Sequence, residues 1–289
     1  MANRKKGLII TALGVLFVVP DSLFVRLIDN EPMVIAFWRG AISGSLILIV
    51  LLMSNGISVF KPVLRSGVPG AVYIILIGST TPAFVLAVTY TSVSNVVFIF
   101  ASIPIFAVFF SYVFLGEVIQ LSTILTAFFV ISGLAIIAYG SGTSEIASWK
   151  GDLWAVYVSA AYAGALTAVR RVKEISMVPT IPIAYIGTAL IISLFYSPFD
   201  EFELSGLLFF GHGLFIGIAS WLLTLGPRYL SSPEVSLLIL LESALAPLLV
   251  WLMVGEFPGE WALVGGAIVI IALLVFNMLK LSKDRYVDD

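Results

Sequence analysis

Three ionisable side chains, Asp21, His212 and Glu242, lie within stretches that are otherwise apolar. A charge inside a membrane-spanning helix costs about 2.5–3.5 kcal/mol on insertion scales, so such residues are functional candidates by default. A carboxylate can bind a substrate ammonium or carry a proton, and a histidine titrates near neutrality. The three residues are therefore candidates for cation binding or for proton coupling.

Each of these residues also has a structural interpretation. Asp21 follows a proline, so it can instead cap a broken helix or pair with Arg26 or Arg39. His212 can be a hydrogen-bonded packing residue, and Glu242 a protonated glutamate bonded between helices. We interpret Arg39 as structural, either as an ion-pair partner between helices or as a side chain that snorkels outward. The sequence leaves these alternatives open.

Aromatic and small polar side chains form the second group of candidates. An apolar cavity with aromatic walls accepts flat hydrophobic groups, and ring pairs add about 0.5–1.5 kcal/mol. Asn95, Phe98 and Ser102 share one face of a predicted helix. Ser79 and Thr80 precede a proline, in a stretch that can kink and open backbone carbonyls or can hydrogen-bond between helices. The candidate cavity residues are Phe17, Asp21, Ser79, Thr80, Tyr90, Asn95, Phe98, Ser102, Tyr157, Tyr162, His212, Trp221, Glu242 and Ser243.

The types of residue present exclude several kinds of chemistry. The chain has no cysteine and a single histidine, so it has no thiolate nucleophile and no multi-histidine metal site. It has no GxxxxGK[ST] pattern, so ATP does not drive it by itself, and we expect no cofactor. Lysines lie in termini, loops or helix ends, and no arginine lies at a midplane. This distribution favours neutral or zwitterionic substrates over phosphates.

Composition places these residues in a membrane. Of 289 residues, 60% are hydrophobic and 11% are charged, with a mean hydropathy of +1.12, whereas soluble domains carry about 25% charged residues. We expect an integral membrane protein that contacts lipid and a small-molecule substrate, not nucleic acid, and that is not an enzyme. A membrane helix needs roughly 20 mainly apolar residues. Ten spans are predicted, at Gly7–Val25, Met33–Met53, Val68–Val88, Ser94–Leu115, Leu121–Tyr139, Leu153–Val169, Thr180–Tyr196, Leu207–Leu225, Val235–Val254 and Trp261–Leu281.

The basic residues indicate an orientation. With the N-terminus in the cytoplasm, twelve of the fifteen basic residues fall on the inner side. The other three, Arg26, Arg39 and Lys150, lie at or near the outer side. The positive-inside rule therefore favours a multi-pass protein of the inner (plasma) membrane with both termini in the cytoplasm.

The two halves of the chain resemble each other at a nearly fixed offset. An offset of 139 maps Gly78 to Gly217, Tyr90 to Tyr229, Ser92 to Ser231, Gly116 to Gly255 and Glu117 to Glu256, and an offset of 144 maps Gly7 to Gly151 and Arg26 to Arg170. The predicted repeats are residues 1–140 and 152–289, joined by residues 141–151. Because five spans are an odd number, the second repeat must enter the membrane inverted. Inverted repeats are typical of secondary transporters that alternate access around a central site.

Small residues predict close helix contacts. Gly40 and Gly44 form a GxxxG pattern in the second span, and Gly265 and Gly266 lie in the tenth. Such positions let two helices approach closely. The partner helix can belong to the same chain or to a second copy, so a homo-oligomer stays open.

Motifs at the ends of the spans resemble a transporter family. Phe37-Trp38-Arg39 opens the second span, PIFAVFFSYVFLGE ends the fourth, and LESALAPLLVWLMVGEFPGEWALVGGAIVI is the corresponding part of the second half. These resemble the EamA branch of the drug/metabolite transporter superfamily, and most of all its YddG-type exporters of aromatic and other neutral amino acids. One departure is Ser243, which stands where the second repeat usually has proline, with Pro247 four residues later, so a kink there can be shifted.

The resemblance implies ten helices in two five-helix repeats, with the first, third, fourth, sixth, eighth and ninth spans lining a central cavity. It implies export of neutral, above all aromatic, amino acids, either passively or with proton coupling. A carrier for other amphipathic or cationic solutes is the nearest alternative, and it gains favour if Asp21 and Glu242 both face the substrate. A membrane-embedded enzyme would need clustered acidic or histidine residues, and a channel would show flux without counterflow.

Overall fold

The computed structural model describes residues 2–116, 121–141, 147–172, 175–199, 202–225, 229 and 232–287, and the described regular structure is helical throughout. Two short elements, η1 (Ile57–Phe60) and α4 (Lys61–Leu64), lie in the connection between α3 and α5. The remaining helices are α1 (Ala2–Val18), α2 (Asp21–Leu27), α3 (Pro32–Asn55), α5 (Gly67–Tyr90), α6 (Val93–Phe100), α7 (Ile103–Leu115), α8 (Leu121–Ser141), α9 (Trp149–Arg170), α10 (Thr180–Ser193), α11 (Phe202–Leu225), α12 (Ser232–Val254) and α13 (Glu260–Val287).

Every predicted span falls on one of these helices or on two consecutive ones. Within the described residues, six segments are long and apolar enough to cross a membrane, so the chain is a multi-pass membrane protein. They are Lys5–Leu27, Pro32–Asn55, Gly67–Tyr90, Val93–Leu115, Ile124–Ser141 and Ser205–Leu225. Shorter apolar helices occupy Thr180–Ser193, Leu241–Val254 and Glu260–Phe276. The seventh predicted span ran to Tyr196, but α10 ends at Ser193 because the chain turns ahead of Pro198.

Two spans of the first half are broken. The first is interrupted at Pro20, between α1 and α2, and the fourth at Ala101 and Ser102, between α6 and α7. Proline does not break the other helices, since α5 continues through Pro82 and α12 continues through Pro247. Helix α12 therefore has no break at Ser243 or at Pro247.

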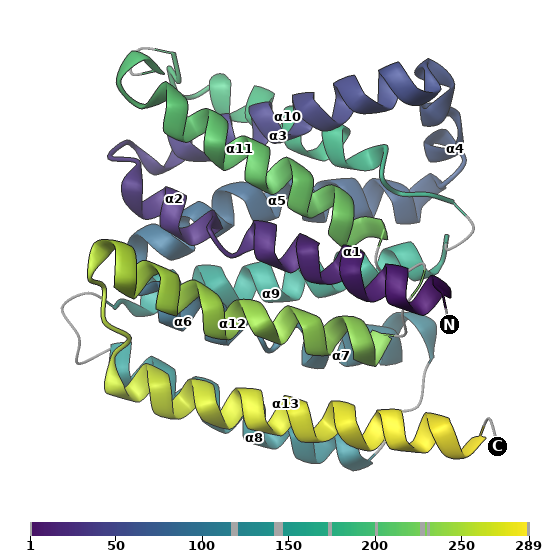
Figure 1. The fold of residues 1–289 in the computed structure, drawn as a ribbon, viewed down its shortest axis with the longest axis vertical. Coiled ribbons are helices and arrows are strands. Elements are labelled where there is room, and N and C mark those ends of the chain that lie inside the picture. The colour runs from purple at the N-terminus through teal and green to yellow at the C-terminus, as the bar shows by residue number, and fades with distance from the viewer. Residues whose placement is uncertain are drawn as a thin grey trace.

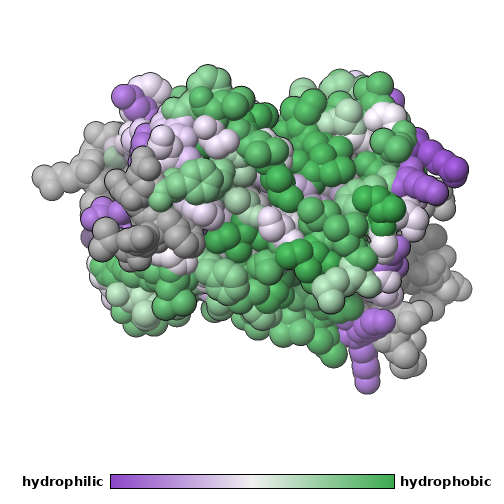
Figure 2. Space-filling view, turned by 90° about the horizontal axis from the view of Figure 1, so that it is seen from above, coloured by the Kyte–Doolittle hydropathy of each residue, from purple (hydrophilic) through white to green (hydrophobic). Residues whose placement is uncertain are grey.

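The helices lie side by side in a bundle whose two ends carry the connections (Figure 1). Both chain termini lie at the same end, which we call the terminal end, and the opposite end is the far end. Figure 2 shows hydrophobic residues across the middle of one face and hydrophilic residues gathered at the two ends. This distribution is the one that a bilayer requires of a spanning bundle.

The two halves use corresponding packing partners. The α8–α13 and α3–α10 pairs lie at opposite extremes of the long axis (Figure 1). Between them, the contact of α5 with α9 corresponds to that of α11 with α1. The contact of α3 with α11 corresponds in the same way to that of α10 with α5. Each of these two contacts thus has a counterpart in which the two halves are exchanged.

Glycines form the closest helix crossings, and they do so within this chain. A Cβ atom on Gly40 would lie 2.9 Å from the carbonyl oxygen of Tyr185 on α10. At the other extreme, a Cβ atom on Gly265 of α13 would lie 2.5 Å from the carbonyl oxygen of Gly133 on α8. The sequence left open whether these glycines contact a helix of the same chain or of a second copy. In the structure, Gly40 and Gly265 each contact a helix of the same chain.

The Gly133–Gly265 crossing should not tolerate an added methyl group. Gly265→Ala is expected to lower the free energy of unfolding by about 1–3 kcal/mol, because the obstructing atom is backbone and cannot rotate away. Gly187→Ala on α10 is the matched control, since a Cβ atom there meets nothing within 4 Å. Denaturation in mixed micelles would compare the two, and equal stabilities would contradict a tight crossing.

Candidate functional site

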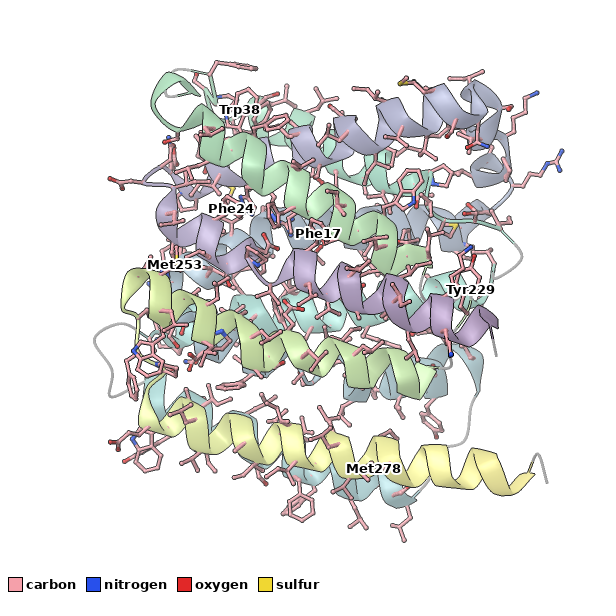
Figure 3. All side chains as sticks on the ribbon, in the orientation of Figure 1. Phe17, Phe24, Trp38, Tyr229, Met253 and Met278 are labelled. Carbon is pink, nitrogen blue, oxygen red and sulfur yellow. The ribbon has the colours of Figure 1, made fainter. Side chains whose placement is uncertain are left out.

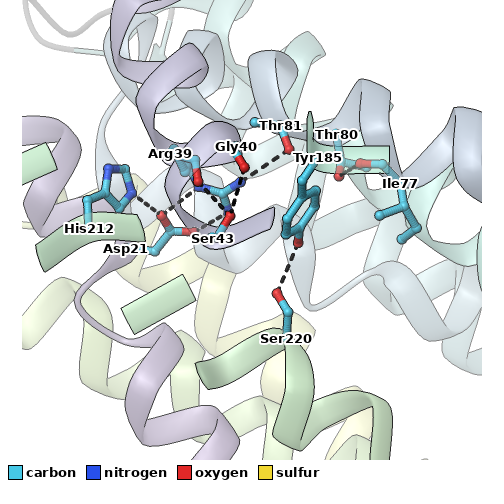
Figure 4. Close-up of polar contacts among 10 residues, drawn as sticks. All are labelled: Asp21, Arg39, Gly40, Ser43, Ile77, Thr80, Thr81, Tyr185, His212 and Ser220. Atoms are coloured by element: carbon cyan, nitrogen blue, oxygen red, sulfur yellow. Dashed lines mark hydrogen bonds and ion pairs between the residues drawn. The ribbon is translucent and has the colours of Figure 1, made fainter. Parts of the chain in front are cut away.

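A buried ion pair lies at the break in the first span. Asp21 is the first residue of α2, immediately after Pro20, and Arg39 is on α3. The Arg39 Nε atom lies 3.0 Å from Asp21 Oδ1, and Arg39 Nη2 lies 2.7 Å from Asp21 Oδ2 (Figure 4). Asp21 is 3% exposed and Arg39 is 8% exposed. Of the alternatives open from the sequence, pairing of Asp21 with Arg39 is the one observed.

His212 completes a polar cluster on the other side of Asp21. Its Nε2 atom lies 2.6 Å from Asp21 Oδ1, and its ring stacks on Phe24 with a centroid distance of 5.4 Å. His212 is fully buried, and its Nδ1 atom has no hydrogen-bond partner among the described residues. Because His212 comes from α11, the cluster joins the two halves of the chain (Figure 4).

Arg39 also contacts α5, the helix of the third predicted span. Its Nη1 atom lies 3.4 Å from Thr81 Oγ1, and its guanidinium lies over the Phe84 ring at 5.1 Å. Both residues belong to α5, so α2, α3, α5 and α11 meet around one carboxylate and one guanidinium. The bidentate geometry lets the two charges compensate each other in an apolar surrounding.

Aromatic side chains surround this cluster. Phe17 of α1 contacts Phe215 of α11 at a centroid distance of 5.4 Å (Figure 3 labels Phe17 and Phe24). Tyr162 and Trp221 pack against a buried group that includes Tyr73 and Tyr185. Phe17 thus lies beside the cluster, because Phe215 also contacts Phe24, which stacks on His212. Tyr162 and Trp221 instead belong to the separate group around Tyr185.

Tyr73, Tyr185 and Ser220 are central residues that the sequence did not single out. The Tyr185 hydroxyl lies 3.0 Å from Ser220 Oγ, which links α10 to α11 (Figure 4). Tyr185 is on the seventh span, which the family resemblance did not count among the cavity-lining ones. The signal that could have found it is the GxxxG pattern, because Gly40 packs on Tyr185 itself.

Glu242 of α12 lies within electrostatic reach of Asp21, Arg39 and Tyr162. It is partly exposed, unlike Asp21 and His212. Its carboxylate makes no hydrogen bond or ion pair to the part of the chain that the structure describes. Among the described residues, Glu242 thus differs from Asp21, whose carboxylate is bonded to Arg39 and His212.

Serine hydroxyls satisfy the backbone at the break in the fourth span. Ser243 Oγ donates to the carbonyl oxygen of Val97 at 3.1 Å, and Ser159 Oγ donates to that of Ile99 at 3.2 Å. Ser102 Oγ also donates to Ile99, at 2.6 Å. Ser102 and Ser243 thus bond backbone in this structure. Ser243 fulfils this role where the family pattern has proline.

Ser79 and Thr80 also bond their own helix. Ser79 Oγ donates to the carbonyl oxygen of Leu76, and Thr80 Oγ1 to that of Ile77, each at 2.7 Å. Phe98 packs on Gly266 of α13 and, with Ser243, lines a cavity of about 330 Å³ beside α12. Ser79 and Thr80 thus take no part in the hydrogen bonds around Asp21, although the adjacent Thr81 contacts Arg39.

A second polar cluster lies at the far end of the bundle. Asp152, in the first turn of α9, accepts hydrogen bonds from Thr91 Oγ1 at 2.7 Å, Asn95 Nδ2 at 3.0 Å and Ser141 Oγ at 2.5 Å. All four residues are buried. Asn95 therefore belongs to a network that joins α5, α6, α8 and α9.

Tyr90 and Tyr157 line an exposed cavity of about 520 Å³ at the same end, together with Trp149, Lys150 and Trp154. Tyr157 donates from its hydroxyl to Ser79 Oγ at 2.8 Å. These aromatic residues and the lysine suit a membrane–water interface. In the described ranges, no three histidine or acidic side chains converge as a metal site would need.

Two of three comparisons with known proteins found a similar protein or family. A solved structure titled "Crystal structure of protein" is 19% identical, with a TM-score of 0.65, and the alignment covers 96% of this chain and 98% of that chain. At that identity the likeness shows the fold alone. No curated protein matches the chain. Residues 5–139, close to the whole first half, match the model of the EamA-like transporter family.

Proposed function

We propose that this protein is an alternating-access secondary transporter that exports neutral, above all aromatic, amino acids across the inner membrane. The match to the EamA-like transporter family supports a membrane transporter of the drug/metabolite type. The observation that carries the substrate class is the Asp21–Arg39 pair, because it leaves the centre of the bundle with compensated charges.

A cationic substrate would need uncompensated acids at the centre. Asp21 is already bonded to both Arg39 and His212, so among the described residues at the centre Glu242 is the acid that remains for a substrate ammonium. A single carboxylate suits the ammonium of an amino acid, and the surrounding tyrosine, tryptophan and phenylalanine rings suit a flat side chain. This arrangement favours the amino-acid assignment over the cationic-solute alternative.

The packing supports an inverted repeat of ten spans, residues 1–140 and 152–289. Gly78 of α5 approaches Ala184 of α10, and its sequence equivalent, Gly217 of α11, approaches Ser43 of α3. The contact between α5 and α10 corresponds to the contact between α11 and α3 when each helix is replaced by its equivalent in the other repeat. Both termini lie at one end, as an even number of spans requires, and we place that end in the cytoplasm by the distribution of basic residues (Figure 1).

The location of the central cluster fits alternating access. Asp21 comes from the first repeat and His212 from the second, so rocking of one repeat against the other would change their contact. Transporters of this architecture bind substrate near the midplane, at the interface of the repeats and beside broken helices. The break at Pro20 lies at this interface.

Purified protein in liposomes tests the substrate class. We expect saturable uptake of labelled phenylalanine that unlabelled neutral aromatic amino acids inhibit and that tetraphenylphosphonium and spermidine do not. Inhibition by the two cations alone would instead favour the cationic-solute carrier. No uptake above empty liposomes, from protein shown to be folded, would contradict the amino-acid assignment.

Glu242→Gln should weaken phenylalanine binding about tenfold, because a charge-assisted hydrogen bond contributes about 1.5–3 kcal/mol. The half-saturation concentration for uptake would measure the effect. Glu260→Gln, at an exposed position at the start of α13, is the matched control and should leave it unchanged. If Glu242→Gln and Glu260→Gln had equal half-saturation concentrations, the substrate ammonium would bind somewhere other than Glu242.

A further inference from the structure

The repeated Gly-Glu motif has no role in the central site, yet its second copy makes specific contacts. Glu256 Oε2 lies 2.7 Å from Arg26 Nε, and Glu256 Oε1 accepts a hydrogen bond from the backbone N–H of Val93 at 2.7 Å. The side chains of Arg26 and Glu256 are 20% and 11% exposed, so water screens this pair less than a surface ion pair. Glu117, the first copy, lies outside the described residues.

These contacts join three segments at the far end. Arg26 Nη2 also donates to the carbonyl oxygen of Thr91 at 2.8 Å. Arg26 is in the last turn of α2, and Glu256 follows α12. Thr91 lies between α5 and α6, and Val93 is the first residue of α6. The ion pair therefore bridges the first and second halves of the chain, at a point where α2, α6 and α12 reach the far end (Figure 1).

The Arg26–Glu256 ion pair lies farther along α2 than Asp21, towards the far end. Arg26 is five positions after Asp21 on the short helix α2, which corresponds to about 7.5 Å along the helix axis. A far-end opening beside the Asp21 cluster can be formed by separating α2 from α6 or from the α12–α13 connection. Such a separation breaks contacts of Arg26 or of Glu256.

We propose that Arg26 and Glu256 form a latch that closes the far-end entrance to the central site. The inference rests on the proposed alternating-access function, since a latch needs a state in which it is open. A purely structural tie predicts a different result, because its loss would lower stability without exposing the interior of a folded protein.

Labelling of a buried thiol tests the latch. The chain has no cysteine, so an introduced thiol is the sole reactive one. Ser22 is 2% exposed and lies four residues before Arg26, on the same face of α2 and beside Asp21. In nanodiscs, Ser22→Cys should react slowly with a charged, water-soluble maleimide. Adding Arg26→Gln or Glu256→Gln should raise the rate about tenfold, equivalent to about 1.4 kcal/mol.

Matched variants make the test decisive. The double variant Arg26→Gln/Glu256→Gln should react at about the rate of either single variant, because each single change already removes the ion pair. Glu260→Gln, an exposed acid at the same end, should leave the rate unchanged. Glu31→Cys, which is exposed, should label rapidly in every background.

A third variant removes the hydrogen bond between the Val93 N–H and Glu256 and leaves the ion pair in place. Val93 is the first residue of α6 after the N-cap Ser92, a position that proline suits, so Val93→Pro deletes the N–H that Glu256 accepts. It should also raise the labelling rate. Equal rates in all variants, with melting temperatures well above the assay temperature, would overturn the latch. Because labelling needs no substrate, failed phenylalanine uptake would leave this result standing.

Discussion

Arg39→Leu is expected to destabilise the protein by about 3–5 kcal/mol, the largest effect of any single substitution considered for this chain. The change removes the guanidinium that binds both carboxylate oxygens of Asp21 and leaves a buried, uncompensated charge. It also removes the contacts of Arg39 with Thr81 and Phe84 of α5. Unfolding by sodium dodecyl sulfate in mixed micelles would measure the change.

A double variant separates charge from packing. Asp21→Asn/Arg39→Leu removes both charges, so its loss of stability should be smaller than the sum of the single losses. Arg65→Leu, at an exposed arginine, is the matched control and should stay within about 0.5 kcal/mol of the parent. If Arg39→Leu were as stable as Arg65→Leu, the central ion pair would not be holding the helices.

Asp152→Ala is expected to cost about 3 kcal/mol or more. The carboxylate accepts hydrogen bonds from Thr91, Asn95 and Ser141, and its loss removes three buried hydrogen bonds at once. Each unsatisfied buried group costs about 1–3 kcal/mol. Because the network joins α5, α6, α8 and α9, amide hydrogen exchange at the far ends of these helices should accelerate as well.

Two controls define the cause of that loss. Asp152→Asn keeps the volume and one carbonyl acceptor, so it should lose clearly less stability than Asp152→Ala. Asp29→Ala changes an exposed acid at the same end and should have little effect. Equal losses for Asp152→Ala and Asp29→Ala would mean that the network does not stabilise the bundle.

The positions of the spans could be predicted because apolar length is a property of the sequence alone. Breaks were harder to predict, since Pro20 interrupts a span whereas Pro82 and Pro247 do not. Neighbouring hydroxyls and local backbone adjustments can satisfy the groups that a proline frees in a membrane helix. Whether such neighbours are present depends on packing, which sequence spacing does not fix.

The sequence identified Asp21 and His212 as central candidates, but it did not predict which residues they would contact. Asp21 could have met Arg26 or Arg39, because helices that are hydrophobic on all sides give no sign of their rotation. Asp152 and Glu256 lie at helix ends, where charges usually face water. Their contacts with other helices, such as that of Asp152 with Ser141 of α8, therefore left no signal in the sequence.

Countertransport tests the proposed mechanism most directly. Liposomes containing the protein would be loaded with unlabelled phenylalanine, and the initial uptake of labelled phenylalanine would be compared with that of unloaded liposomes. An alternating-access carrier predicts faster uptake into loaded liposomes, because internal substrate returns the site to the outside. Measurable uptake that internal phenylalanine slows or leaves unchanged would contradict alternating access and favour a channel.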